Sequence, residues 1–168
     1  MITCDSSVQH PFQPGAHGLA CDGVSLQSIV ASVGTPAYIY SARAIRDAYR
    51  AIDDAFGSYP HAIHYALKAN STLAIVRVLK ALGSHADANS GGEIEVALRA
   101  GFGPREIVFT GVGKTGGELE YAIESDVGGG WPLGFGVEDA TQRAWLARWA
   151  SASRRSASSD CADRHSAY

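Results

Sequence analysis

The sequence is poor in the residues and segments that mark several common protein classes. Its three cysteines, Cys4, Cys21 and Cys161, are odd in number and widely spaced, so they form neither a metal-binding nor a redox motif. This usage favours a reducing compartment, and we expect a cytoplasmic protein. No apolar run approaches the length that crosses a membrane. The first residues, Met1 to Gln13, lack the basic start and apolar centre of a signal peptide.

A strong excess of charge of either sign is also missing. The 168 residues carry a formal net charge of −3 at pH 7, and charged residues make up 18% of the chain. Since nucleic-acid-binding domains usually show a clustered basic excess, we expect no nucleic-acid partner, and we expect no membrane partner. With 46% hydrophobic residues and a mean hydropathy of −0.04, the chain fits one globular domain that can bury a core.

The most informative stretch is an alternating run from Ala62 to Leu67. Large side chains occupy the odd positions, and smaller ones, including His64 and Ala66, occupy the even positions. Strict alternation favours a β-strand, and apolar residues at both sets of positions indicate a strand covered on both faces, as in a parallel sheet or barrel. Lys68 then lies at the carboxyl end of the strand, on the same face as His64. Barrel enzymes place reactive groups at such strand ends.

Two interpretations of Lys68 follow from the pattern. A desolvated lysine loses its proton more easily, and the neutral amine can condense with an aldehyde such as that of pyridoxal phosphate to form a Schiff base. This functional interpretation requires the side chain to project into a closed, largely dry pocket. The alternative is a lysine that marks a strand end in solvent, because most lysines are surface residues.

Helix and strand signals alternate along the chain. Before them, Met1–Asp22 is polar and holds several Pro and Gly residues, so we expect a loosely ordered arm. Serine caps and glycine stops give the helix limits, and period-two alternation gives the strands. In chain order we expect a helix over Leu26–Val33, a strand over Thr35–Tyr40, a helix from the Ser41 cap through Phe56, the strand over Ala62–Leu67, a helix over Thr72–Leu82, a strand over Ser84–Ala88, a helix over Ile94–Ala100, a strand over Ile107–Phe109 and a helix over Leu119–Ile123.

Two helix starts carry the Ser/Thr-x-x-Glu spacing of a capping box. In each, a hydroxyl accepts a hydrogen bond from the helix backbone and the glutamate reaches back to the cap. The two pairs are Ser90 with Glu93 and Thr115 with Glu118. This structural role explains all four residues without catalysis.

Two other features suggest a ligand and are weighed against simpler interpretations. The run Gly111–Thr115 ends in Gly-Lys-Thr, but a P-loop needs glycine at the position of Val108, so we expect a loop and helix start and no nucleotide site. His61 and His64 are three residues apart on a predicted strand and would point to opposite faces, which makes them a poor metal pair.

Three ordered strings resemble one known family. Tyr65–Asn70 (YALKAN) is similar to the cofactor-lysine motif of the barrel-type, fold-type III pyridoxal phosphate decarboxylases. Asp87–Glu93 resembles the segment after the next strand, and Ile107–Thr115 resembles the one after the third. Their Ser-Gly-Gly-Glu and Gly-Val-Gly-Lys-Thr forms look most like the diaminopimelate decarboxylases and less like the ornithine or arginine enzymes. The resemblance runs from about Ser25 to Asp126.

The resemblance implies an α/β fold, namely the N-terminal portion of a partial (β/α)8 TIM-type barrel of the alanine racemase-like, PLP-binding kind. It implies pyridoxal 5'-phosphate as cofactor, with Lys68 forming the Schiff base and Asp87 close to the cofactor. His64, on the face of Lys68, could line the same site. For Asp87 the alternative is a strand-end residue that bonds loop amides.

The activity implied by the resemblance is a carboxy-lyase reaction of lysine biosynthesis. Meso-2,6-diaminopimelate loses carbon dioxide from its D-centre and gives L-lysine. The implied partners are a small-molecule amino-acid substrate and, for the intact family, a second copy in a homodimer.

The sequence changes character at Val127. From there to Tyr168 it holds all three tryptophans but no lysine and no isoleucine, and Ser151–Ser159 is a Ser/Ala/Arg tract. We therefore expect an arm over 1–24, a partial barrel over 25–126 and a divergent, disordered tail over 127–168.

Our hypothesis for this change is truncation, through a frameshift, after about three of the eight βα units of such a barrel. A chain of this kind would be inactive alone. It would then be a non-catalytic remnant or a binding module. A small barrel that carries the cofactor without decarboxylating is a further alternative, and an ornithine- or arginine-type decarboxylase is the alternative for the implied enzyme.

Overall fold

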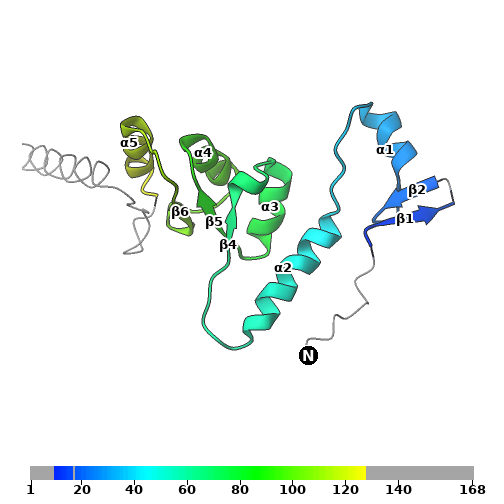
Figure 1. Cartoon of the computed structure of the whole chain (residues 1–168), viewed down its shortest axis with the longest axis horizontal. Coiled ribbons are helices and arrows are strands. Elements are labelled where there is room, and N and C mark those ends of the chain that lie inside the picture. The colour runs from blue at the N-terminus through cyan, green and yellow to red at the C-terminus, as the bar shows by residue number, and fades with distance from the viewer. Residues whose placement is uncertain (1–9, 17, 128–168) are drawn as a thin grey trace, which may run out of the picture. The chain divides into compact units, whose positions relative to one another are not determined.

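The computed structural model describes residues 10–16 and 18–127 of the chain, and Figure 1 shows their helices and strands in chain order. The described residues divide into two compact units, which are taken separately below. The first contains the residues up to His61 together with Ala81–Gly83, and the second contains Ala62–Lys80 and the residues from Ser84 onward.

The first unit begins with a three-stranded antiparallel sheet in the order β1-β2-β3. Cys21 pairs with Val24, so only Asp22 and Gly23 connect β2 to β3. Both connecting residues have positive φ, 49° and 83°, as a two-residue Asp-Gly hairpin turn requires. The prediction of a loosely ordered arm is therefore wrong for these residues, because this hairpin signal was not recognised. The strands are β1 (Phe12–Gly15), β2 (Gly18–Cys21) and β3 (Val24–Ser25).

Two helices complete the first unit, and both are confirmed at their predicted limits: α1 (Leu26–Val33) and α2 (Ala42–Phe56). The Ser41 hydroxyl caps α2 by accepting from the backbone N–H of Ala44 at 2.9 Å. The strand predicted over Thr35–Tyr40 is wrong, since this segment forms no regular structure and pairs with no strand among the described residues. A strand needs a neighbour for its backbone groups, and alternation alone does not supply one.

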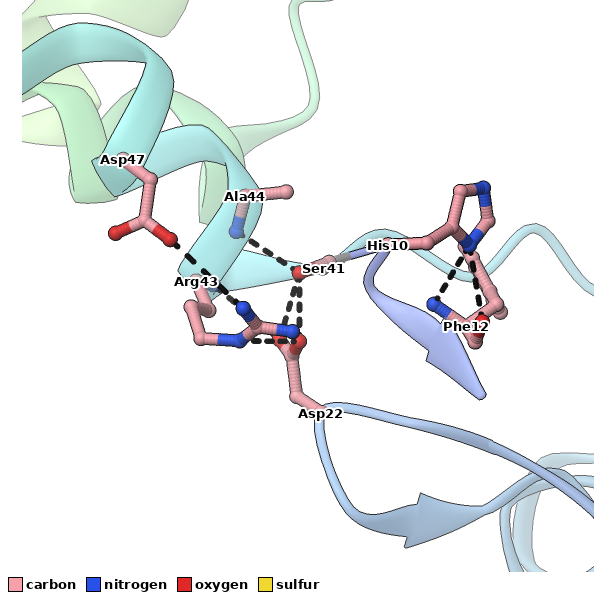
Figure 2. Close-up of polar contacts among 7 residues, drawn as sticks. All are labelled: His10, Phe12, Asp22, Ser41, Arg43, Ala44 and Asp47. Atoms are coloured by element: carbon pink, nitrogen blue, oxygen red, sulfur yellow. Dashed lines mark hydrogen bonds and ion pairs between the residues drawn. The ribbon is translucent and has the colours of Figure 1, made fainter. Parts of the chain in front are cut away.

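A polar cluster links the turn between β2 and β3 to the start of α2 (Figure 2). Both carboxylate oxygens of Asp22 lie 2.8 Å from the Ser41 hydroxyl, which donates to them, and one also accepts from the backbone N–H of Arg43 at 3.2 Å. The Arg43 guanidinium forms ion pairs with Asp22 at 3.4 Å and with Asp47 at 3.9 Å. The hydrogen bond from Ser41, more than any other contact, lowers the pKa of Asp22.

The second unit is a parallel three-stranded sheet in the order β4-β5-β6, and a helix follows each strand. This alternation confirms the predicted α/β class, and Figure 1 shows α3, α4 and α5 after β4, β5 and β6. The elements are β4 (His64–Ala66), the 3₁₀ helix η1 (Leu67–Ala69), α3 (Leu73–Ala81), β5 (His85–Ala88), α4 (Gly91–Ala100), the 3₁₀ helix η2 (Pro104–Glu106), β6 (Ile107–Phe109) and α5 (Gly116–Glu124).

One face of this sheet carries the core. In register, Ala86 pairs with Ile107 and Ala88 pairs with Phe109, and all four side chains are buried. They form one cluster with residues of α4 and α5, including Ile94. Burial of such apolar area is the main favourable term in folding, so this face holds the second unit together.

The opposite face of the sheet mixes polar side chains with Ala66 and Val108 and is only half-buried. Successive side chains of a strand alternate between faces, so His64, His85 and Asp87 share this second face. The prediction that both faces of the first parallel strand are covered is therefore only half correct for the described residues. Every helix within residues 10–16 and 18–127 is too short or too polar to span a membrane.

Candidate functional site

The parallel strands bring three loops to one edge of the sheet. Because β4, β5 and β6 run in the same direction, the residues that follow them lie at the same carboxyl edge, which we call the rim. Lys68 follows β4, Asn89 follows β5 and Thr110 follows β6. The rim of the second unit is the place where the described residues gather chemically useful side chains.

Lys68 is present at the rim, but its surroundings differ from the prediction. The strand ends at Ala66, and Lys68 lies in η1, where its side chain is exposed. The prediction of a closed, dry pocket is wrong for this structure. The sheet of the described residues has three strands and does not close around the lysine, whose side chain is exposed.

The backbone around Lys68 is well anchored. Leu67, the residue before it, is completely buried in the core. The hydroxyl of Tyr65 donates to the backbone carbonyl of Asn70 at 3.1 Å, and the Asn70 side-chain oxygen accepts from the backbone N–H of Thr72 at 2.9 Å. The lysine therefore has a fixed backbone and an exposed side chain.

Asp87 belongs to a triangle of side-chain hydrogen bonds at the rim. Its Oδ1 accepts from the hydroxyl of Thr110 and from the side-chain N–H of Asn89, the latter at 3.3 Å. Asn89 also donates to the Thr110 hydroxyl at 2.7 Å. The carboxylate is thus held by side chains from two loops. The alternative considered for Asp87 was instead a set of hydrogen bonds from backbone amides of a loop.

The loop after β6 passes close to this triangle. Gly111 has a φ of +93°, and a Cβ atom placed there would lie 3.4 Å from the Cβ of Asn89. A larger residue would strain the backbone and crowd Asn89, so glycine permits the approach of the two loops. Neither Asn89 nor Thr110 was predicted from the sequence pattern. Continuing the alternation of β5 and β6 by one step past their ends would have placed both on the face of Asp87.

His64 lies on the half-buried face of the sheet, next to His85, a second histidine that the sequence pattern did not single out. His64 and His85 are in-register neighbours, their ring centroids lie 4.9 Å apart, and the rings meet edge to face at 77°. The Nδ1 atoms of both rings are buried and have no hydrogen-bond partner among the described residues.

Burial lowers the pKa of His64, and repulsion by His85 adds to this. A hydrogen bond with the backbone of Ala86 and the charge of Asp87 act in the opposite direction but do not outweigh it. The ring therefore favours its neutral form at pH 7, in which it carries one N–H donor and one acceptor nitrogen.

Other places in the described chain offer less. Within residues 10–16 and 18–127, no three His, Cys, Asp or Glu side chains come together in a way that could hold a metal ion. A hollow of about 370 Å³ in the first unit is lined by residues of β1, β2 and the segments next to them, with Asp22 and Arg43. Because these two charges pair with each other, the hollow offers no unbalanced charge to a ligand.

Comparison with known proteins identifies the family. The family model described as "Pyridoxal-dependent decarboxylase, pyridoxal binding domain" matches residues 42–151, well over half of the chain. The matched range contains Lys68, Asp87 and His64, and it continues past Asp126, where the sequence analysis places the end of the resemblance.

Curated relatives agree with this match. The diaminopimelate decarboxylases of Pseudomonas aeruginosa and Aquifex aeolicus are each 44% identical to the chain, over 109 and 121 residues, or 65% and 71% of its length. The aligned stretches make up 26% and 27% of those two proteins. The chain thus spans about a quarter of the curated relatives it matches.

Solved structures show the same fold. The diaminopimelate decarboxylase of Helicobacter pylori, complexed with L-lysine, is 40% identical, with a TM-score of 0.58 over 62% of this chain and 26% of that one. The lysine/ornithine decarboxylase of Vibrio vulnificus, complexed with putrescine, covers 74% of this chain and 32% of that one with a TM-score of 0.64. At 23% identity it shows the fold alone.

These findings confirm the predicted resemblance and the predicted partial barrel. Three strands and three helices alternate in the second unit, and solved decarboxylases share this arrangement with the chain. The chain therefore belongs to the family formed by the pyridoxal binding domain of the pyridoxal-dependent decarboxylases.

Proposed function

We propose that this chain provides the cofactor-bonding lysine of a pyridoxal phosphate-dependent amino-acid decarboxylase. The observation that carries the proposal is the position of Lys68, directly after β4 at a rim that it shares with Asp87. The family match includes both residues. The neutral amine of a lysine is the group that bonds covalently to the aldehyde of pyridoxal phosphate.

The described residues fit the aldehyde end of this cofactor. Lys68 presents an exposed amine, and the hydrogen bonds from Asn89 and Thr110 hold the Asp87 carboxylate in one orientation. His64 offers a predominantly neutral ring on the face of Asp87. In our proposal Lys68 bonds the cofactor, and the Asp87 carboxylate stabilises positive charge on the cofactor. His64 lines the face of the sheet that carries Asp87. We assign no phosphate ligand among the described residues.

Pyridoxal phosphate, when bound, supplies an electron sink that allows an amino acid to lose its carboxylate. For the whole protein we propose diaminopimelate as the amino acid, with L-lysine and carbon dioxide as products. The names of the curated relatives, at 37–46% identity, support this choice. A role in lysine biosynthesis, a cytoplasmic setting and a homodimeric assembly remain predictions.

The first test maps where pyridoxal phosphate bonds to the chain. The sequence has only three lysines, Lys68, Lys80 and Lys114, so selectivity can be measured by borohydride reduction and peptide mass mapping. Lys80 donates to both carboxylate oxygens of Glu106 at 2.7 and 2.6 Å, so this ion pair already engages its amine. Lys114 donates to the carbonyl of Gly111. We expect label predominantly on Lys68.

Two arginine variants control this experiment. Lys68→Arg keeps the positive charge but cannot bond the aldehyde in this way, so the absorbance of bound cofactor should disappear. Lys80→Arg keeps the ion pair with Glu106 and should leave the absorbance unchanged. Equal labelling of all three lysines, or a persisting absorbance in Lys68→Arg, would contradict the proposed role of Lys68.

The exposure of Lys68 favours a second candidate function, in which the chain binds pyridoxal phosphate without decarboxylating. The Lys68 amine is exposed to water, whereas the active sites of enzymes commonly exclude water from the reacting groups. Selective label on Lys68 together with no release of carbon dioxide from diaminopimelate would favour this candidate.

A further inference from the structure

One side-chain hydrogen bond spans the turn that carries Lys68. Tyr65 lies in β4, two residues before η1, and Asn70 is the residue that follows η1. The Tyr65 hydroxyl donates to the Asn70 backbone carbonyl at 3.1 Å, so the bond ties the two ends of the turn together. The residue at the centre of this closed turn is Lys68.

The core holds the ring of Tyr65. By alternation, Tyr65 lies on the face of the sheet that carries the core, where it pairs in register with buried Ala86. Its ring packs against the hydrophobic cluster that contains Leu67 and Phe109, while its hydroxyl reaches the rim. The ring therefore connects a rigid part of the unit to an exposed turn.

The far end of the turn is also anchored. The Asn70 side-chain oxygen accepts from the backbone N–H of Thr72 at 2.9 Å, immediately before α3 begins at Leu73. The carbonyl that Tyr65 bonds thus belongs to a residue already tied to the start of a helix. Neither end of the turn can shift without breaking one of these two hydrogen bonds.

A fixed turn matters because the lysine side chain itself is exposed. A long, exposed lysine gives up rotamer freedom when its amine is held at one point, and motion of its Cα atom would add to that cost. We propose that Tyr65 is a positioning residue for Lys68, acting through the Asn70 carbonyl and not by touching the cofactor. This inference rests on the proposed role of Lys68.

The variant Tyr65→Phe tests the inference because it removes the hydroxyl and keeps the ring in the core. We expect the dissociation constant for pyridoxal phosphate, followed by absorbance, to rise about twofold to tenfold, the range for one uncharged hydrogen bond. Borohydride labelling of Lys68 should slow in parallel. In the chain without pyridoxal phosphate, hydrogen exchange of the amides of residues 67–70 should accelerate, while exchange in α4 stays unchanged.

Tyr121→Phe is the matched control. Tyr121 also donates its hydroxyl within the second unit, to Glu95 at 2.6 Å, but it joins α5 to α4 and does not bond the Lys68 turn. It should lower the free energy of unfolding and leave labelling of Lys68 and exchange of residues 67–70 unchanged. An equal loss of labelling in both variants would show a general effect of stability and overturn the positioning role.

The two proposals fail in different ways. If pyridoxal phosphate does not label Lys68 in the unchanged chain, the proposed function is wrong and this inference falls with it. If Lys68 is labelled normally in both the unchanged chain and Tyr65→Phe, only the positioning role of Tyr65 is wrong.

Discussion

At the scale of single residues, the contacts of His61 determine its charge. Its Nε2 lies 2.9 Å from a carboxylate oxygen of Asp53, and its Nδ1 lies 2.8 Å from the backbone carbonyl of Tyr59. Both partners only accept hydrogen bonds, and a neutral imidazole has a single N–H, so both bonds form together only when the ring is protonated. The Tyr59 carbonyl first, and Asp53 next, raise the pKa of His61 above 6.5.

This geometry predicts a pH dependence of stability. The pKa of His61 is higher in the folded chain than the value of about 6.5 expected after unfolding. The protonated ring therefore stabilises the folded chain fully below about pH 6.5, and this stabilisation is lost as pH rises through the folded pKa. Asp53→Asn should lower the pKa of His61 and weaken this dependence. An NMR titration of the His61 ring protons measures the pKa directly.

Asp54→Asn is the control for this titration, because Asp54 neighbours Asp53 in sequence and makes no hydrogen bond to His61 in the described structure. It should leave the pKa of His61 close to that of the unchanged chain. A pKa of His61 at or below 6.5 in the unchanged chain would show that the ring does not make both hydrogen bonds.

Single residues of the site were only partly predictable from sequence. Alternation placed His64 and Ala66 on one face of their strand, because the direction of a strand side chain is a local property. Asn89 and Thr110 were missed, because their contact with Asp87 depends on how neighbouring strands align. The exposure of Lys68 agrees with the alternative of a strand-end lysine in solvent. The local pattern left both interpretations open, because the number of strands around a residue is not a local property.

At the scale of elements, Glu118 joins the starts of two helices. One of its carboxylate oxygens accepts from the backbone N–H and the hydroxyl of Thr115, each at 2.9 Å, and completes the predicted capping box of α5. The other accepts from the backbone N–H of Gly91, the first residue of α4, at 3.1 Å. The Thr115 backbone first, and Gly91 next, lower the pKa of Glu118.

Breaking this cap should destabilise the second unit. We expect Thr115→Ala to cost about 1 kcal/mol of unfolding free energy, as is typical for loss of a helix N-cap. Glu118→Ala should cost more, because it also removes the acceptor for Gly91. The pKa of Glu118 is lower in the folded chain than in the unfolded chain. Its contribution to the unfolding free energy is therefore present above the unfolded pKa and is lost as pH falls through the folded pKa. Urea unfolding at several pH values measures both effects.

Glu120→Ala supplies the comparison on the same helix, at an exposed position. Its effect should stay within about 0.5 kcal/mol, as for most surface substitutions. Should Thr115→Ala and Glu120→Ala prove equally stable, the cap seen in the structure contributes nothing measurable.

The contrast between helices and strands explains how far the fold could be predicted. Helices α1 and α2 end at the glycine stops that the sequence indicates, and α2 begins at its Ser41 cap, because such signals act over a few residues. Helix α1 also begins at its predicted limit, although the Ser25 side chain makes no capping hydrogen bond. The strand predicted over Thr35–Tyr40 is absent, because a strand also needs a partner. In the capping box predicted for α4, the Ser90 hydroxyl accepts from the backbone N–H of Glu93, as predicted. The Glu93 carboxylate, however, accepts from the backbone N–H of Asn89, one residue before the cap.

At the scale of the whole molecule, the buried cluster lies within the second unit. Phe109 is completely buried there, and α2 in the first unit buries only Tyr49. We expect Phe109→Ala to cost about 3–5 kcal/mol, as for other large aromatic residues in cores. Hydrogen exchange should accelerate in β5 and α4 and remain unchanged in α2, because the lost contacts all belong to one unit.

The matched variant Phe56→Ala alters a ring in α2 that is 46% exposed. It should leave exchange in β5 and α4 unchanged. If Phe109→Ala accelerates exchange equally in α2 and α4, the two units unfold together and the described division has no energetic counterpart.

The common direction of β4, β5 and β6 has a consequence for how such a protein can diversify. A further strand laid beside β6 in the same direction delivers its own loop to the edge where Lys68 and Asp87 already lie. New recognition groups are therefore gained by lengthening or replacing one loop, while the lysine stays where its own turn holds it. With Lys68 in its proposed role, the bond to the cofactor and the choice of substrate therefore belong to separate segments of the chain.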